Sequence, residues 1–531
     1  VCVGGSTLEA AEALGNVPGE LAIDVLNRVG SLLDKNLLHA DPGAPGAAPR
    51  FGMLETIREY GLEQLAASGE EPSIRRAHAA YYQALATEAV AHLAGVEQAA
   101  WLARLDLDHD NLRATLRWAL DAGETTLALQ MAGALGRFWL ARGYLGEGRR
   151  WLAAALAAAA GQESPARATA LRVAGMLANY QGDYGQAAAL CGESVALFRR
   201  LGDRRGIALA SHGLAQALSV RGEYAPAAAH CAASVVILRA AGTPWELAFA
   251  LWYHANVLIL AADDAGARPL LEESLALFQQ VGDSWSGAYA VYNLACLAVS
   301  ARDYATAQRL FDEALATMRA LGDRRGITRC LAGLGDVAFG QADYPAARAR
   351  YDEARQIISD LGDRWFIALT LEGLAGVAAA EDQAPRAARL LGAAATLREA
   401  IGAPLPRWRS ALYDPLLARL HTQLDPAAWA AAWAAGRALT PAQAAAPEPS
   451  LSGTAPPPEP PGGTGRAASG LTPREGDVLR LVAAGLTDAQ VAAQLVISPR
   501  TVHTHLNAIF GKLGVSSRSA ATRYAVEHDL A

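Results

Sequence analysis

Residues 304–323, YATAQRLFDEALATMRALGD, and residues 344–363, YPAARARYDEARQIISDLGD, decide the fold of most of this chain. The two stretches carry Tyr, Ala and Leu-Gly at matching positions. Each residue in the first stretch is separated from its match in the second by the same number of residues as Tyr304 from Tyr344. The same spacing continues on both sides, in the alanines Ala187, Ala227, Ala267, Ala307, Ala347 and Ala387 and in the glycines Gly202, Gly242, Gly282, Gly322, Gly362 and Gly402, each after an apolar residue. Self-similarity at a fixed period of this size predicts an all-α solenoid of stacked helix pairs.

Each repeat has room for two helices of about 15 residues and two turns. We predict that each glycine ends the second helix of a pair in a left-handed cap, and that each alanine lets the paired helices approach closely. The register resembles tetratricopeptide repeats, with longer helices. Six repeats are expected over residues 164–403, in a solenoid domain at 164–440, with degenerate helical repeats at 76–163 before it.

Aromatic residues gather near the first helices of the third and fourth repeats, where a solenoid forms its concave surface. The predicted groove contacts are Trp252, Tyr253, Trp285, Tyr289 and Tyr292, and ordinary core packing is the alternative for them. Packing is the favoured interpretation for the four tyrosines that keep the repeat phase, Tyr184, Tyr224, Tyr304 and Tyr344.

Residues 1–75 form a separate small module. The sequence predicts helices at 8–14 and 18–29 and a further helix that begins at Ser31. Two short strands, at 37–40 and 50–54, flank the turn DPGAPGAAP and predict a hairpin. An amphipathic helix that ends at Gly69 follows. Helices followed by a hairpin indicate a winged helix.

The composition bounds the class of protein. A chain of 531 residues with a net charge of −7 holds several domains and does not coat a nucleic acid over its whole surface, although a local DNA-binding module is compatible with that charge. The five scattered cysteines predict buried apolar side chains in a reducing compartment, without a metal site: Cys2, Cys191, Cys231, Cys296 and Cys330. No uninterrupted apolar stretch predicts a membrane span, so we expect a cytoplasmic protein.

Residues 441–470 are a linker rich in Pro, Gly and Ala, which we expect to be disordered, and residues 471–531 predict a compact unit of four helices. Thr472 and Glu475 form a capping box at the first helix. Val478, Leu479, Leu481 and Val482 of the first helix and Val491, Ala492 and Leu495 of the second are predicted to face the core, as are Val502, Leu506, Ile509 and Leu513 of the third.

The third helix has a second, polar face. Arg500, His503, Thr504 and Asn507 share it, and none of them is acidic. Side chains of this kind read base edges and bind phosphates in a DNA major groove. Lys512, Arg518 and the helix N-terminus near Thr487 can meet the DNA backbone.

Residues 471–531 resemble the LuxR/NarL-type helix-turn-helix. LTPRE, AAGLT and ISPRTVHTHLNAIFGKLGV followed by SSR carry the resemblance. The resemblance implies base reading by His503, Thr504 and Asn507, with histidine at the first position where the family commonly has lysine. The expected backbone contacts are Thr487, Arg500, Thr501, Lys512 and Arg518.

The N-terminal stretches GGSTLEAAEAL, LLDKNLL, RFGMLETIREYGLEQLAASGE and HDNLRATLRWAL resemble the winged-helix end of a STAND-type (NB-ARC-like) ATPase. In large LuxR-type regulators of this plan a nucleotide-binding domain comes first, so an N-terminally truncated chain is expected. No GxxxxGK(S/T) phosphate loop occurs in the sequence. We therefore expect no enzymatic activity and no cofactor in this chain, with ATP acting only through an upstream domain.

The residues favour a bacterial DNA-binding transcription regulator that is controlled through its repeats. Six Lys and Arg against five Asp and Glu in residues 471–531 predict weak binding by one copy, and therefore a homodimer or higher oligomer on double-stranded DNA. The further expected partners are RNA polymerase and a protein or small-molecule effector at the repeats, with no membrane. The alternatives are an interaction scaffold localised to DNA and, third, an enzyme.

Overall fold

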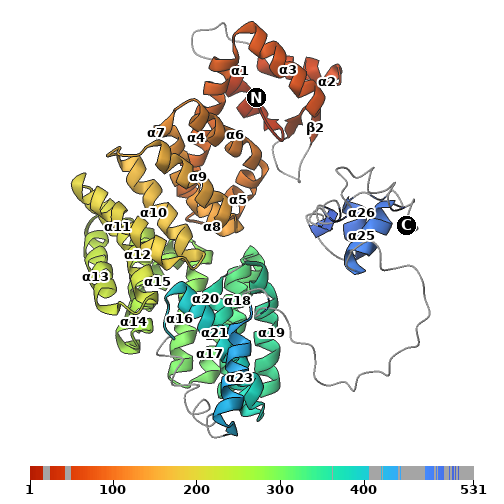
Figure 1. Ribbon diagram of the computed structural model, residues 1–531. Helices are drawn as coiled ribbons and strands as arrows, with labels where there is room; N and C mark the ends of the chain where they lie inside the picture. The colour runs from red at the N-terminus through yellow and green to blue at the C-terminus, as the bar shows by residue number, and fades with distance from the viewer. Residues whose placement is uncertain are drawn as a thin grey trace. The chain divides into compact units, whose positions relative to one another are not determined.

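The computed structural model divides the chain into two compact units, Val1–Glu448 and Pro449–Ala531 (Figure 1). The residues it describes are 1–15, 24–41, 49–361, 363–405, 420, 423–440 and 443 in the first unit, and 473–483, 486, 488–495, 501, 502, 505, 506, 509, 512 and 525 in the second. The predicted linker, 441–470, lies outside them apart from Gln443.

The N-terminal module is a small sheet surrounded by helices. Its elements are β1 (Ser6–Thr7), α1 (Leu8–Gly15), α2 (Val25–Asp34), β2 (His39–Asp41), β3 (Arg50–Gly52) and α3 (Glu55–Ser68). The strands are antiparallel in the order β1-β3-β2, which confirms the predicted hairpin and adds a short strand beside it. Gly69 caps α3 in the left-handed conformation, at φ 79°, as predicted.

One prediction in this module is wrong. The sequence suggested that one helix ends at Val29 and another begins at Ser31, but α2 continues from Val25 to Asp34. Gly30 lies inside this helix, where a glycine is tolerated because the apolar positions continue in helical phase on both sides of it.

Six helices connect the module to the repeats. They are α4 (Glu71–His92), α5 (Gln98–Leu107), α6 (His109–Asp121), α7 (Thr125–Ala134), α8 (Gly136–Arg142) and α9 (Leu145–Ala158). Their core includes the fully buried Tyr82, Phe138 and Trp139. Arg50 of β3 forms an ion pair with Asp108 at 2.8 Å, and Asn111 accepts a hydrogen bond from the backbone of Val3. These contacts fix the sheet on the helices.

The repeats consist of six helix pairs that recur at the spacing seen in the sequence, which confirms the predicted solenoid. The first helices are α10 (Pro165–Tyr180), α12 (Arg204–Val220), α14 (Pro244–Leu260), α16 (Ser284–Ser300), α18 (Arg324–Gly340) and α20 (Arg364–Ala380). The second helices are α11 (Tyr184–Arg200), α13 (Tyr224–Ala241), α15 (Asp264–Val281), α17 (Tyr304–Leu321), α19 (Tyr344–Leu361) and α21 (Ala384–Ile401). The six repeat alanines are all fully buried, as close approach of the paired helices requires.

Capping follows the prediction with one exception. Gly202, Gly282, Gly322 and Gly402 have positive φ after the second helices. Gly362 lies outside the described residues. Gly242 is instead extended, at φ −90° and ψ 166°. Thr243, which directly precedes Pro244, is extended as well and caps the next helix, α14. The chain therefore turns here without a left-handed glycine.

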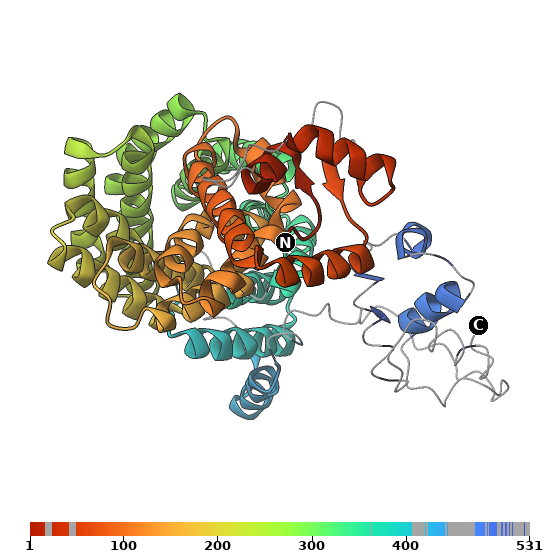
Figure 2. The same cartoon turned by 90° about the horizontal axis from the view of Figure 1, so that it is seen from above.

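The solenoid closes on itself. Ile401 and Ala403, at the end of the sixth repeat, pack with Ala178, Tyr184 and Ala217 of the first two repeats. The view from above shows α10 to α21 curving round a centre (Figure 2). The first and last repeats are therefore neighbours, and the concave surface is enclosed on most sides.

Four of the cysteines are buried in this solenoid. Cys191, Cys231, Cys296 and Cys330 are free thiols, as is the half-buried Cys2. Burial raises the pKa of Cys191 and Cys231 to about 12, so both stay protonated and behave as small apolar side chains. No cluster of metal-ligating side chains occurs within the described ranges.

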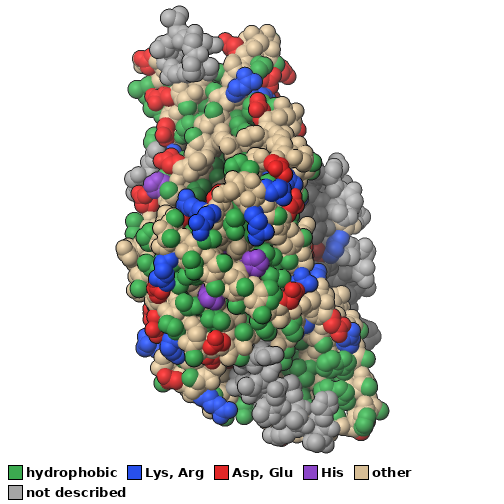
Figure 3. Space-filling view, turned by 90° about the vertical axis from the view of Figure 1, so that its left-hand side faces the viewer, with side chains coloured by type: hydrophobic (Ala, Val, Ile, Leu, Met, Phe, Trp, Pro, Cys, Tyr) green, Lys and Arg blue, Asp and Glu red, His purple; other side chains and the backbone are tan. Residues whose placement is uncertain are grey.

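Helix α13 is long and apolar enough to cross a membrane by its length and composition. It is the second helix of a repeat, however, and its buried residues Ala227, Cys231, Ser234 and Leu238 face the neighbouring helices. Figure 3 views the side of this unit on which α13 lies in Figure 1, and hydrophobic side chains are interspersed there with charged ones. Packing within the repeats thus uses one face of α13, while Val236 is 69% exposed.

Candidate functional site

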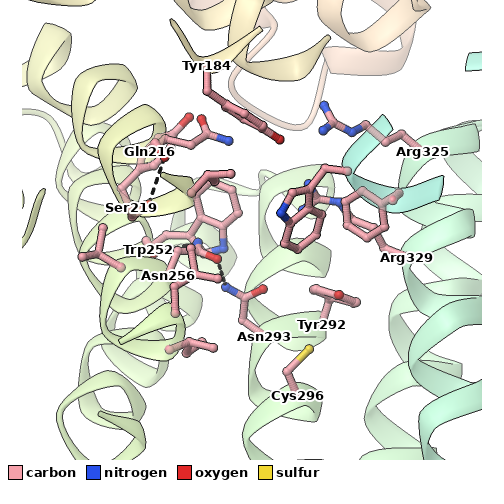
Figure 4. A pocket seen from close by; sticks show the side chains of 17 residues that line it. Tyr184, Gln216, Ser219, Trp252, Asn256, Tyr292, Asn293, Cys296, Arg325 and Arg329 are labelled. Carbon is pink, nitrogen blue, oxygen red and sulfur yellow. Dashed lines mark hydrogen bonds between the residues drawn. The ribbon is translucent and has the colours of Figure 1, made fainter. Parts of the chain in front are cut away.

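A pocket lies on the inner surface of the closed solenoid. Its empty volume is about 800 Å³, counting the part open to solvent. Almost all its lining comes from the first helices of the pairs, because these form the concave surface (Figure 4). The lining residues are Tyr184, Gln216, Ser219, Val220, Trp252, Tyr253, Asn256, Val257, Ile259, Leu260, Tyr292, Asn293, Cys296, Arg325, Arg329, Trp365 and Phe366.

Two arginines on α18 form one side of this pocket. Arg325 and Arg329 are one helical turn apart and therefore lie on the same face of the helix. In Figure 4 they lie opposite Gln216, Ser219 and Trp252. The pocket thus has a cationic side and an aromatic and amide side.

Arg325 is held by contacts with the first and sixth repeats. Its Nη2 lies 2.7 Å from Oδ2 of Asp363, an ion pair without the angle of a hydrogen bond, and its Cζ lies 4.4 Å from the ring centre of Tyr180. Burial lowers the pKa of Arg325, but the carboxylate of Asp363 together with Tyr180, Tyr289 and Tyr184 outweighs burial, and the net shift is upward. The guanidinium therefore stays charged.

Arg329 is held by aromatic rings. Its Cζ lies 4.5 Å from the ring centre of Phe366 and 5.4 Å from that of Tyr289, which are cation–π distances. Throughout the described part of the chain no carboxylate forms an ion pair with it. Its charge is therefore available to a ligand.

Several buried polar atoms around the pocket have no hydrogen-bond partner among the described residues. They are Nε and Nη1 of Arg325, Nε of Arg329, Nε1 of Trp252 and Oε1 of Gln216. A buried polar group without a partner costs about 1–3 kcal/mol, so such groups gather where a ligand or water completes them. Asn256 and Asn293, by contrast, bond to each other at 2.6 Å.

The tyrosines of the pocket are neutral. Burial raises the pKa of Tyr184, Tyr253 and Tyr292 above the usual value. Their hydroxyl groups can donate or accept hydrogen bonds, and they add no negative charge to the lining.

The predicted groove residues divide into two groups. Trp252, Tyr253 and Tyr292 line the pocket. Trp285 and Tyr289 do not; the indole of Trp285 and the hydroxyl of Tyr289 both donate to Asp323, each at 2.8 Å. Of the tyrosines assigned to packing, Tyr184 packs against Ile401 and also faces the pocket.

Sequence reasoning missed both arginines, although a signal for them existed. Arg325 and Arg329 stand one repeat after Trp285 and Tyr289, so they replace two aromatic residues at equivalent positions. Trp365, one repeat further along, also lines the pocket. When equivalent positions of successive repeats change from aromatic to cationic residues, the concave surface changes what it can contact.

The second unit has the predicted core. Helices α25 (Pro473–Ala483) and α26 (Asp488–Leu495) contribute Val478, Leu479, Val482, Val491 and Ala492, all buried. Leu481 and Leu495 are half-buried against them. Val502, Leu506 and Ile509 are buried as well, which confirms three of the four predicted positions of the third helix; Leu513 lies outside the described residues.

The predicted DNA contacts fall mostly outside the described residues. Those outside are Thr487, Arg500, His503, Thr504, Asn507 and Arg518. Thr501 is exposed. Lys512 donates to both oxygens of Glu475, at 2.9 and 2.7 Å, so this lysine joins the third helix to α25.

Residues 469–525 match the sequence family described as bacterial regulatory proteins, luxR family. The C-terminal unit carries a LuxR-family helix-turn-helix domain. The LuxR-type domain has relatives among curated regulators. Over 52 residues, 10% of this chain and 25% of the relative, it is 54% identical to a nitrate/nitrite response regulator protein homologue of Haemophilus influenzae.

A longer match includes an HTH-type transcriptional regulator of Mycobacterium tuberculosis, 36% identical over 149 residues. That match covers 28% of this chain and 16% of the mycobacterial protein, so the chain spans a minor part of its relative's length.

The fold resembles solved repeat proteins. A STAND protein with a tetratricopeptide repeat sensor from Pyrococcus horikoshii aligns with a TM-score of 0.47 and 14% identity, over 79% of this chain and 60% of that one. A Rap protein complexed with competence and sporulation factor aligns with a TM-score of 0.44 and 13% identity, over 60% of this chain and 98% of that one.

Proposed function

We propose that this chain is a DNA-binding transcription regulator whose LuxR-type domain acts under the control of a signal bound in the solenoid pocket. The match of residues 469–525 to the luxR family carries the DNA-binding part of the proposal. Base reading by His503, Thr504 and Asn507 is part of the same proposal.

The pocket supports the sensing part. It is lined mainly by the successive first helices α12 to α20, and several of its buried polar atoms have no partner within the described chain. In this proposal the ligand pairs with these atoms and thereby removes the cost of leaving them unpaired.

The regulator acts as an oligomer on DNA in this proposal. The small excess of basic residues in the LuxR-type domain gives each copy few phosphate contacts, so two copies on a two-fold related site bind better than one. Contact with RNA polymerase would follow binding beside a promoter. Any ATP dependence would come from a nucleotide-binding domain outside this chain.

The decisive experiment is a mobility-shift and reporter series with the full chain. Selected DNA sites are bound by the wild type, His503→Ala and Asn507→Ala, with Arg309→Ala on the exposed surface of α17 as the control. We expect both helix variants to lose sequence-specific binding by about 10-fold or more and to lose reporter control, while the control keeps both. Equal binding by all four proteins would refute regulation through this helix and would favour an interaction scaffold instead.

A further inference from the structure

We propose that the solenoid pocket binds a small molecule that carries one carboxylate on a flat, apolar body. The proposal rests on the proposed function, in which this pocket holds the signal, and names the chemical class of that signal. Its parts are the two arginines of α18, the rings beside them and the closure of the solenoid.

The charge of the lining selects a monoanion. Arg325 and Arg329 are the charged residues of the lining, and Asp363 offsets the first of them. One net positive charge therefore faces the pocket. A carboxylate matches it, whereas a phosphate near −2 would leave a buried negative charge without a partner.

The free donors fit a planar anion. Nε and Nη1 of Arg325 and Nε of Arg329 have no acceptor in the described structure. Nε–H and Nη1–H leave different edges of the Arg325 guanidinium, and Nη2 faces Asp363. Each free N–H therefore offers a single charged hydrogen bond to a carboxylate oxygen. Because the rings of Tyr289 and Phe366 hold Arg329, little side-chain entropy is lost when the ligand binds.

The rest of the pocket fits an apolar body. Trp252 and Tyr292 supply aromatic surface opposite and below the arginines (Figure 4). Trp365 and Phe366 also line the pocket, with the ring of Phe366 beside Arg329. Nε1 of Trp252 and Oε1 of Gln216 offer one donor and one acceptor to a polar atom at the far end. An aromatic acid, with its carboxylate at α18 and its ring near α14, uses all these features.

Such a ligand would sit where the solenoid closes. Tyr184 of the first repeat, Arg325 of the fifth and Trp365 of the sixth all line the pocket. Tyr180 and Arg325 already join the two ends of the repeat array. A ligand between them contacts both ends at once. It therefore binds the closed solenoid more tightly than an opened one and strengthens the closure.

The test uses the full chain and matched probes. Indole-3-acetate and phenylacetate are titrated against their neutral primary amides by calorimetry, with Trp252 and Trp365 as fluorescent reporters. We expect the acids to bind at least about 10-fold more tightly than the amides, since charged hydrogen bonds are about twice as strong as neutral ones. Inorganic phosphate is titrated separately and should show no binding.

Two arginine variants complete the test. Arg329→Gln should weaken binding of the acids by about 10- to 100-fold and leave the amides unchanged, whereas Arg309→Gln on the outer surface should change neither. Thermal unfolding checks that Arg329→Gln is folded, and Trp252→Phe, which removes the far donor, gives a second variant that keeps the packing.

Each outcome separates this proposal from the proposed function. If neither acid binds, or acids and amides bind alike, or phosphate binds in their place, the carboxylate proposal fails while specific DNA binding stands. If the acids bind as expected but His503→Ala leaves DNA binding intact, the proposed function fails and the pocket assignment remains.

Discussion

The guanidinium of Arg137 on α8 lies 2.7 Å from the carboxylate of Asp283 at the start of α16, although 146 positions separate them. The same guanidinium lies over the rings of Trp245 and Trp285, at 4.8 and 5.2 Å from their centres. Asp283 also accepts hydrogen bonds from Trp245 and Ser286, at 2.7 Å each. One arginine therefore joins the degenerate helices to the third and fourth repeats and holds the segment before the repeats against their concave surface.

Replacing this arginine should destabilise the first unit. Arg137→Met leaves the fully buried carboxylate of Asp283 without its counter-charge, which costs about 3–5 kcal/mol of unfolding free energy. The control is Arg239→Met, whose exposed pair with Glu273 contributes under about 1 kcal/mol. Urea unfolding followed by circular dichroism measures both.

The same variant should also shift the acid limit of stability. Burial raises the pKa of Asp283, but Arg137 and the hydrogen bonds outweigh it, and the net pKa is lowered. A lowered carboxylate pKa stabilises the fold above the unfolded pKa, and this stability is lost as the pH falls through the folded value. Without Arg137 the loss should begin at a higher pH. Identical acid profiles for Arg137→Met and the wild type would show that the pair contributes nothing.

A buried histidine sets a second pH dependence. Burial, with the charge of Arg172, lowers the pKa of His212 to about 3. Its Nε2 lies 2.7 Å from Oγ of Ser234, and that hydroxyl donates to the carbonyl of Ala208, so Nε2 carries the proton of a neutral ring and donates it. Unfolding lets the ring take up a proton at its ordinary pKa of about 6.5.

The unfolded state thus binds more protons than the folded state between the two pKa values, so stability falls as the pH falls through this window. The loss amounts to up to about 1.4 kcal/mol per pH unit. His212→Gln should reduce this slope, and His39→Gln, at an exposed position, should not. A residual slope is expected, because burial lowers the pKa of His78 to about 4. An unchanged slope in His212→Gln would contradict the assignment.

Local features were predictable from the sequence, and long-range ones were not. Ala187 and its five equivalents, Gly202 and the buried stripe from Val502 to Ile509 follow from periodicity within a few helical turns. The contact of Tyr180 with Arg325 depends on the accumulated twist of several repeats, which no local pattern encodes. Arg329 was missed although its repeat position carried a signal, because its contacts with Tyr289 and Phe366 lie between the first helices of neighbouring repeats.

Lys512 should stabilise the fold of the LuxR-type domain rather than bind DNA. The sequence predicted a phosphate contact, but its ammonium group pairs with Glu475, whose side chain is only 7% exposed. We expect Lys512→Met to destabilise the LuxR-type domain, because Glu475 would lose its counter-charge. The salt dependence of DNA affinity should stay unchanged in this variant.

Arg518→Met is the matched comparison. This residue remains predicted as a DNA backbone contact, so its removal should lower the slope of log affinity against log salt by about 1 without unfolding the domain. Fluorescence anisotropy at several salt concentrations and denaturant titration measure the two properties. A lower slope in Lys512→Met at unchanged stability would return Lys512 to the DNA surface.

The packing of helix α23 in the first unit depends on two glycines. Helix α23 (Pro426–Arg437) packs on α21 so closely that a Cβ at Gly436 would lie within van der Waals overlap of the carbonyl oxygen of Arg389, and one at Gly392 would overlap that of Trp433. Only glycine permits this approach of two backbones. Arg437 and Glu399, 2.7 Å apart, pair beside the contact.

Gly436→Ala should therefore force α23 away from α21 and lower the unfolding free energy by about 1–3 kcal/mol, the usual cost of overpacking. Gly192→Ala on α11 is the control, because nothing lies within 4 Å of its added methyl group and a helical alanine is more stable than glycine by about 0.5–1 kcal/mol. The fluorescence of Trp429 and Trp433, whose rings stack at 5.9 Å, reports the displacement. If Gly436→Ala were as stable as Gly192→Ala and left that fluorescence unchanged, the two helices would not be in backbone contact, and α23 would not be a fixed end of the solenoid.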